Sequence, residues 1–298
     1  MLRRSFIASA SAAAVLSTGV ARAIDPFVRK APGRMHLSLA AYSMRKYLAE
    51  TKDPADKIDL MQFVDFCQEL GLSGAELTSY YFPKDVNDGY IADLKRHCHL
   101  RGISVSGGAI ANDFCQADTD KLAADIAHTK LWIDRYSLLG APVIRIFAGG
   151  QPAEERWETV LPRCVAAIEE VCRYAESRGI MLALENHGGV TATAKSLLEI
   201  VRGVNSRAFG VNFDSGNFRD TSDPYAELTE IAPFAVNAQL KVEMYPSGKR
   251  EPADLSRVLG ILSQAGYHGW AVLEYEADED PRTAIPRYVA EIQKLLAG

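Results

Sequence analysis

The sequence predicts an α/β fold, a (β/α)8 TIM barrel formed by a single domain. Short apolar runs rich in β-branched residues alternate with longer segments of helical periodicity, and there are eight of each. Five of the helical segments end in a glycine directly before the next strand, which is the usual place for a helix stop. No linker or low-complexity stretch divides the chain after Ala23. These three observations favour one continuous barrel over two domains.

Each predicted unit begins with a strand, and a helix follows that strand. The predicted strands cover residues 36–43, 74–80, 103–110, 142–149, 180–186, 208–214, 235–243 and 270–276. The predicted helices cover residues 57–70, 87–101, 118–139, 153–178, 193–203, 223–231, 253–265 and 281–296. A doubly wound open sheet is the alternative fold. It would carry a glycine-rich phosphate turn after an early strand, and LAAYSMRKY after the first strand has none.

The first 23 residues, MLRRSFIASASAAAVLSTGVARA, are predicted to be a signal peptide that is not part of the fold. Arg3 and Arg4 precede a short run of small and apolar residues, and Ala21-Arg22-Ala23 has the form of an A-x-A cleavage site. The arginine pair is similar to a twin-arginine signal, so we expect an exported, periplasmic protein without a stable membrane anchor. An uncleaved anchor or a chance basic N-terminus are the alternatives. Residues 24–34 then form a lead, and residues 35–298 form the barrel.

Charge and cysteine usage argue against a nucleic-acid-binding protein and against a disulfide-stabilised one. The 298 residues have a formal net charge of −5, and loss of residues 1–23 removes three arginines and no acids, which leaves −8. An acidic chain repels phosphate backbones, so we expect no nucleic-acid partner. The five cysteines contain no C-x-x-C pair, and we expect no disulfide framework. A hydrophobic content of 48% and a charged content of 24% are those of an ordinary globular protein.

Oxygen-bearing side chains lie at the ends of four consecutive predicted strands: Glu185, Asp214, Gln239 and Glu274. In such a barrel the carboxyl ends of all strands meet at one face, where functional sites lie. Three carboxylates there would repel one another and raise each other's pKa unless a cation lay among them. The pattern therefore predicts one divalent metal, Mn first, with Mg or Co as alternatives. The other interpretation is a rim of ordinary carboxylates satisfied by lysines and water.

The motifs LALENHGG, VNFDSGNF, NAQLKVE and VLEYE, in this order, resemble those of the sugar phosphate isomerase/epimerase superfamily. Its members are xylose isomerase-like TIM barrels related to ketose 3-epimerases and inosose dehydratases. The resemblance extends through LAAYSMR, GAELTSYYFP and VIRIFAGG in the first half of the chain. It implies a Glu–Asp–His–Glu metal site on Glu185, Asp214, Gln239 and Glu274, with glutamine in place of the usual histidine. It also implies a substrate-binding histidine three residues after the aspartate, where this chain has Asn217.

The resemblance gives Glu185 and Glu274 a second role, as the acid and base that move a proton on opposite faces of a keto-sugar. The metal would stabilise the enediolate that forms. Five further residues are predicted to line the substrate site or orient the glutamates: Glu76, Arg145, His187, Asn217 and Lys241. Three of them have simpler interpretations. These are His187 as a structural residue beside Gly188-Gly189, Arg145 as a partner that orients Glu185 or Glu76, and Lys241 as a partner of Glu243.

These features predict a divalent-metal-dependent isomerase or epimerase that acts on an unphosphorylated keto-sugar or related polyol through an enediolate. The acidic segment EYEADEDP after the last strand would repel a phosphate group. The alternatives are a lyase or dehydratase on a 3-keto sugar or glycoside, a non-catalytic periplasmic sugar-binding barrel, and an endonuclease-IV-like DNA repair enzyme. The last needs several zinc-binding histidines, and only His36 and His187 lie in or just after a predicted strand. The sequence leaves open which sugar is used and whether the chain forms a homo-oligomer.

Overall fold

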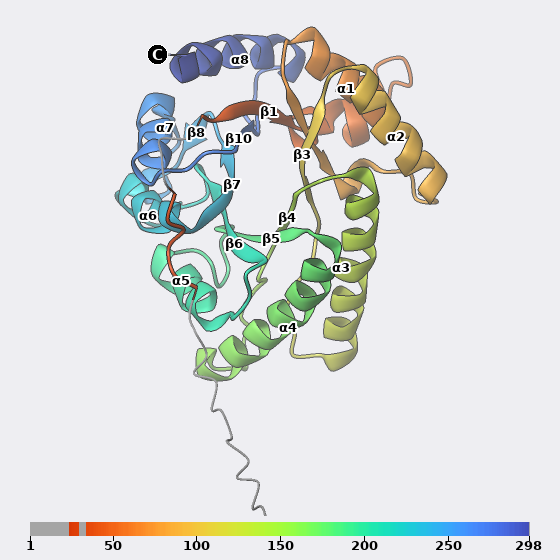
Figure 1. The fold of residues 1–298 in the computed structure, drawn as a ribbon. Coiled ribbons are helices and arrows are strands. Elements are labelled where there is room, and N and C mark those ends of the chain that lie inside the picture. The colour runs from red at the N-terminus through yellow and green to blue at the C-terminus, as the bar shows by residue number, and fades with distance from the viewer. Residues whose placement is uncertain (1–23, 30–33, 298) are drawn as a thin grey trace, which may run out of the picture.

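Eight parallel strands close into a barrel, with a helix between each strand and the next. The computed structural model describes residues 24–29 and 34–297, so the predicted signal peptide lies outside the described residues. The strand order around the barrel is β1-β10-β7-β6-β5-β4-β3-β2. Figure 1 shows the strands at the centre and the helices as a ring around them. The predicted single-domain (β/α)8 barrel is confirmed.

All eight predicted strands and all eight predicted helices are present, with ends shifted by a few residues. The barrel strands are β1 His36–Ala40, β2 Gly74–Thr78, β3 Ser104–Ala109, β4 Val143–Ile146, β5 Met181–Glu185, β6 Phe209–Asp214, β7 Ala235–Leu240 and β10 Trp270–Leu273. The helices are α1 Leu60–Glu69, α2 Asp88–Leu100, α3 Thr119–Leu139, α4 Trp157–Arg178, α5 Ala194–Gly203, α6 Pro224–Ile231, α7 Leu255–Gln264 and α8 Pro281–Ala297. A small antiparallel pair, β8 Glu243–Met244 and β9 Glu251–Pro252, lies outside the barrel.

Local sequence signals explain where the helices begin and end. α1 begins with a capping box, in which the Asp59 side chain accepts from the Gln62 amide and the Gln62 side chain accepts from the Asp59 amide. The predicted glycine stops all have positive φ, which residues with a Cβ rarely adopt: Gly71, Gly102, Gly140, Gly179 and Gly266. These stops turn the chain from five of the eight outer helices back into the barrel.

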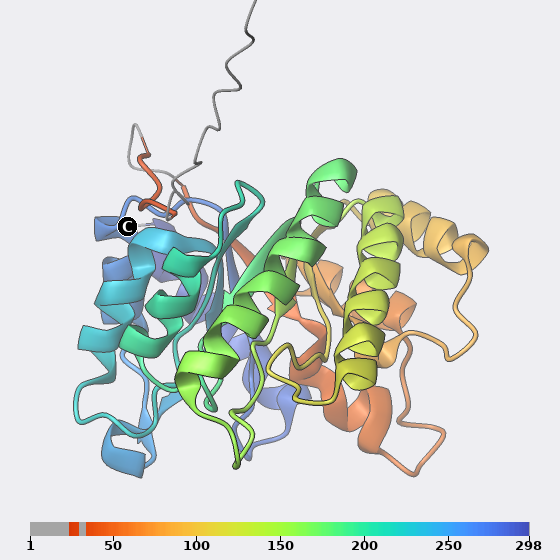
Figure 2. The same ribbon diagram turned by 90° about the horizontal axis from the view of Figure 1, so that it is seen from below.

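The two ends of the barrel are used differently. Residues 24–29 of the lead pack at the amino ends of the strands, where the Phe27 amide donates to the Pro233 carbonyl at 3.1 Å and Arg29 donates to the Ala235 carbonyl. Figure 2 shows the long loops that leave the carboxyl ends of the strands on the opposite side. All five cysteines are buried and free. Among the described residues, no helix is both long and apolar enough to cross a membrane.

Candidate functional site

The carboxyl ends of four neighbouring strands bring the predicted site residues to one end of the barrel. Glu185 is the last residue of β5 and Asp214 is the last residue of β6. Lys241 directly follows β7, and Glu274 directly follows β10. Because these strands are parallel neighbours in the order β10-β7-β6-β5, their ends meet as the sequence predicts.

A cavity of about 210 Å³ opens at this end, which is room for a small polar molecule. Six of the nine predicted site residues line it: Arg145, Glu185, His187, Asn217, Lys241 and Glu274. Tyr42, Tyr80, Phe147, Arg219 and Glu276 complete the lining. Arg219 was not expected because it lies in the loop after β6, beyond the strand ends that the pattern identifies.

Six charged side chains around this cavity pair with one another, and we call them the charged rim: Arg145, Glu185, Asp214, Lys241, Glu274 and Glu276. Arg145 Nε lies 2.7 Å from Glu185 Oε2, and only 6% and 3% of these two side chains are exposed. Asn217 Nδ2 donates to the other oxygen of Glu185 at 3.0 Å. Arg145 also donates to the Ile110 carbonyl at 2.8 Å. Arg145 therefore holds Glu185 in place, in agreement with its simpler interpretation.

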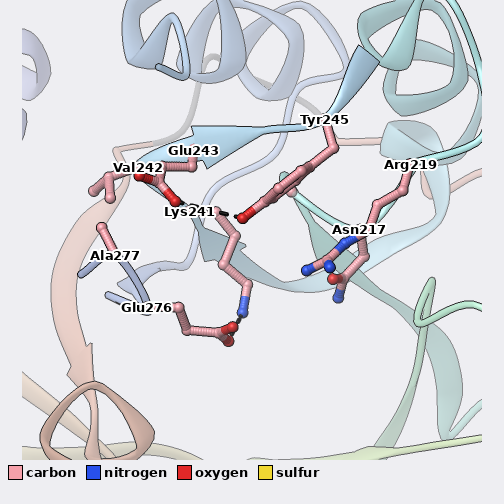
Figure 3. Close-up of a pocket in the computed structure, with 9 residues that line it drawn as sticks. Asn217, Arg219, Lys241, Val242, Glu243, Tyr245, Glu276 and Ala277 are labelled. Atoms are coloured by element: carbon pink, nitrogen blue, oxygen red, sulfur yellow. Dashed lines mark hydrogen bonds and ion pairs between the residues drawn. The ribbon is translucent and has the colours of Figure 1, made fainter. Parts of the chain in front are cut away.

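The second cation of the charged rim, Lys241, contacts three carboxylates. Its ammonium donates to Glu274 and to Glu276, and it lies 3.3 Å from Asp214 Oδ2. Figure 3 shows the Lys241 side chain extending toward Glu276. The predicted alternative partner, Glu243, pairs instead with Arg250 at 2.5 Å.

Burial and charge set the protonation of these groups. Burial raises the pKa of Glu185, and the neighbouring Asp214 and Glu274 raise it further against the effect of Arg145. Burial also raises the pKa of Asp214 to about 7, although Lys241 opposes it. Burial and Arg145 lower the pKa of His187 to about 4, so this imidazole is neutral at pH 7. It stacks on Phe147 with ring centroids 4.3 Å apart.

Three predicted residues do not line the cavity: Asp214, which belongs to the charged rim, and Glu76 and Gln239. Glu76 and Gln239 belong to a separate buried cluster inside the barrel, which we call the amide layer. Its members are Glu76, Asn212, Asn237 and Gln239, each at most 1% exposed. Gln239 Nε2 donates to Glu76 Oε1 at 2.7 Å, and Asn237 Nδ2 donates to Glu76 Oε2 at 3.1 Å. Because β2 and β7 are not neighbours, these bonds cross the barrel interior. Burial raises the pKa of Glu76 to about 7.

The donor atoms do not fit the four-oxygen metal site expected from the sequence. The Gln239 carbonyl accepts from Asn212 Nδ2 at 2.6 Å, and its amide nitrogen is bound to Glu76, so neither atom is directed to the cavity. Lys241 already lies among the carboxylates of Asp214 and Glu274. Within the described ranges, no group of three or more His, Cys, Asp or Glu side chains is arranged to hold a metal ion.

Two residues that the sequence did not single out fix the strand ends. Asn186 Nδ2 donates to the Asp214 carbonyl, and Asn186 Oδ1 accepts from the Asp214 amide, both at 2.9 Å. Ser43 Oγ accepts from the Tyr275 amide at 2.9 Å and donates to the Leu273 carbonyl at 3.2 Å. These bonds place Asp214 and Glu274 by their backbone. Asn186 could have been noticed in the sequence as a polar residue directly after Glu185. Its partner, Asp214 on the next strand, becomes evident only in the fold.

Several solved structures have a similar fold. D-psicose 3-epimerase of Clostridium cellulolyticum H10, solved with D-tagatose, has a TM-score of 0.71 at 15% identity and covers 88% of this chain and 99% of its own. The IOLI protein with a bound zinc atom has a TM-score of 0.71 at 19% identity, covering 88% and 96%. 3-Keto-D-glucoside 4-epimerase of E. coli has a TM-score of 0.67 at 11% identity, covering 88% and 100%. At these identities the likeness shows the fold.

Sequence comparison gives the family. An uncharacterised protein of Methanocaldococcus jannaschii is 32% identical over 100 residues, so the match spans 31% of this chain and a third, 33%, of that relative. The sequence pattern of the family described as xylose isomerase-like TIM barrel matches residues 64–296, which is most of the chain. Together with the closed barrel and the charged cavity at its carboxyl end, this match shows that the chain belongs to the xylose isomerase-like TIM barrel family.

Proposed function

We propose that this chain is an isomerase or epimerase that transfers a proton beside the carbonyl group of an unphosphorylated keto-sugar. One observation carries the proposal. Glu185 and Glu274 line the same cavity from β5 and from the end of β10, and two other strands separate β5 from β10 around the barrel. Two carboxylates that face a substrate from different sides can remove a proton on one face and return one on the other.

The proposed reaction is balanced by these two groups. One glutamate, ionised, takes the proton from the carbon beside the carbonyl, and the electrons of the broken C–H bond form an enediolate. The other glutamate, protonated, gives its proton to the opposite face of that carbon. Glu185 is paired with Arg145, and Glu274 is paired with the Lys241 ammonium. Either glutamate can act as the base while the other, protonated, acts as the acid, because the reverse reaction exchanges the two roles.

The cavity also supports a neutral sugar as the substrate. Asn217 and neutral His187 offer uncharged hydrogen-bonding groups to hydroxyls. Three carboxylates and three cationic side chains line the cavity, so the lining has no excess of positive charge that would select a phosphate. The acidic segment after β10 contributes less than expected, because Arg250 pairs with Asp278 and Arg287 pairs with Glu279.

The relatives support the same substrate class. Two structures with this fold are named as epimerases, one of D-psicose and one of a 3-keto-D-glucoside. The divalent metal expected from the sequence has no supporting arrangement of donor atoms among the described residues, so no step is assigned to it. Export remains a prediction, for which N-terminal sequencing of the periplasmic protein should give Ile24 as the first residue.

Proton exchange tests the proposal directly. The purified chain is incubated in D2O with D-psicose, D-tagatose and a 3-keto-D-glucoside, and deuterium at the carbon beside the carbonyl is followed by NMR. Exchange by the wild type should fall about 10²- to 10⁴-fold in Glu185→Gln and in Glu274→Gln, the usual contribution of a general acid or base. Glu291→Gln, on the exposed face of α8, is the matched control and should exchange like the wild type.

The products separate the alternatives. Exchange with a change of configuration supports the epimerase. Loss of water or of an aglycone after the same exchange identifies the lyase. Sugar binding without any exchange would make the barrel a binding protein and would refute the proposal.

A further inference from the structure

We propose that the Lys241 ammonium is the resident cation of this site and takes the place that the sequence pattern reserves for a divalent metal. The inference rests on the proposed function, because the ammonium would stabilise the negative charge that develops on the substrate oxygen. It assigns the electrostatic part of the reaction to a side chain of this chain. The proton transfers stay with Glu185 and Glu274.

The position of Lys241 in the barrel places its ammonium among the carboxylates. β7 lies between β10 and β6, so Lys241, directly after β7, lies at the end of the middle strand of three. Glu274 and Glu276 approach it from the end of β10, and Asp214 approaches from the end of β6. Each of these contacts is made to the same nitrogen. Two of these three carboxylates, Asp214 and Glu274, are also among the four ligands expected for the metal.

The surrounding backbone is built to accept the lysine stem. A Cβ on Gly216 would lie 2.6 Å from Lys241 Cγ, closer than non-bonded carbons approach, so glycine is needed for the stem to pass. The Lys241 amide donates to Ser215 Oγ at 2.7 Å, which fixes the strand end from which the stem starts. Only 8% of Lys241 is exposed, and the residue lines the cavity. The ammonium is thus held in place and remains within reach of a ligand.

Electrostatics and donor chemistry agree with this assignment. Burial by itself would lower the pKa of Lys241, but Asp214, Glu274 and Glu276 outweigh it and raise the pKa well above its ordinary value. A divalent ion placed beside this ammonium would be repelled by it and by Arg145. The remaining predicted ligand, Gln239, is engaged by Glu76 and Asn212. A fixed positive group beside a developing oxyanion stabilises it without reorganisation.

The experiment compares Mn²⁺ binding by the wild type and by Lys241→Ala, using isothermal titration calorimetry and the EPR signal of free Mn²⁺. Removal of the ammonium leaves several carboxylates without their cation, which creates an oxygen-rich site that hard cations prefer. We expect Lys241→Ala to bind one Mn²⁺ per chain at least about 100-fold more tightly than the wild type. Lys249→Ala, which removes an exposed lysine paired with Glu251, is the matched control and should bind like the wild type.

The Mn²⁺ titration decides the inference whether or not a substrate has been found. Stoichiometric Mn²⁺ binding by the wild type, or Mn²⁺ in the purified protein that a chelator removes together with proton exchange, would overturn it. Weak binding by the wild type together with exchange that survives the chelator supports it. If Lys241→Ala does not fold, the wild-type titration still distinguishes the two outcomes. Failure of every sugar to exchange would refute the proposed function and leave the Mn²⁺ comparison valid.

Discussion

The amide layer and the charged rim both bury carboxylates in the same barrel, but they satisfy them in different ways. In the amide layer, Glu76 accepts hydrogen bonds from the side-chain amides of Asn237 and Gln239 and does not line the cavity. In the charged rim, Glu185 and Glu274 pair with Arg145 and Lys241 and face the cavity. The neutral amide partners hold the Glu76 carboxylate in place, away from the cavity. Charged partners beside a cavity keep a carboxylate ionisable and accessible, which is what proton transfer requires.

The largest effect on stability is expected when a buried cation of the charged rim is removed. Arg145→Met leaves Glu185 buried without its cation, which should lower the free energy of unfolding by about 3–5 kcal/mol. Urea denaturation at pH 7 measures this. Arg287→Met removes a pair in which both side chains are about half exposed, and it should cost at most about 1 kcal/mol. Equal losses in the two variants would contradict the view that burial makes the first pair important.

The amide layer should make stability depend on pH through Glu76. Burial raises its pKa from 4.5 to about 7, so the folded chain holds this proton at pH values where the unfolded chain has lost it. The stabilisation is complete below about pH 4.5 and is lost as pH rises through about 7, by on the order of 3 kcal/mol. Denaturation from pH 4.5 to 8 should show this fall in the wild type and a smaller fall in Glu76→Gln.

The proton-exchange activity of Glu76→Gln tests whether the amide layer takes part in the reaction. Glu76→Gln should exchange substrate protons at a rate close to that of the wild type, because Glu76 does not line the cavity. A loss of exchange as large as that of Glu185→Gln would place Glu76 in the reaction, as the sequence first suggested.

The fold could be predicted because its signals are local. Short apolar runs identified every barrel strand, helical periodicity identified the helices between them, and the glycine stops identified where the chain reverses. Glu185, Asp214 and Glu274 could be found for the same reason, since each lies at or directly after a strand end. These positions need no knowledge of how strands pack.

The sequence does not predict how far along the barrel axis a side chain lies. Gln239, near the end of β7, and Lys241, directly after it, lie two residues apart, so strand periodicity treats them as equivalent. The fold places Gln239 in the amide layer, where Glu76 from β2 reaches it, and Lys241 at the cavity. That difference depends on which side chains arrive from non-neighbouring strands. Arg219 was missed because it lies in a loop, where no periodic pattern applies.

The smallest of the three effects tests how closely the charged rim is built around Lys241. An alanine at Gly216 would bring its Cβ within 2.6 Å of Lys241 Cγ and 2.9 Å of the Glu243 carbonyl oxygen. Gly216→Ala should therefore cost about 1–3 kcal/mol of stability, the usual range for overpacking. By displacing the ammonium from its carboxylates, it should also increase the affinity for Mn²⁺. Gly260→Ala is the matched control, because a Cβ there meets nothing within 4 Å inside α7 and should stabilise the helix by up to about 1 kcal/mol. If Gly216→Ala were as stable as Gly260→Ala and bound no more Mn²⁺ than the wild type, the view that the backbone at Gly216 holds the Lys241 ammonium in place would be contradicted.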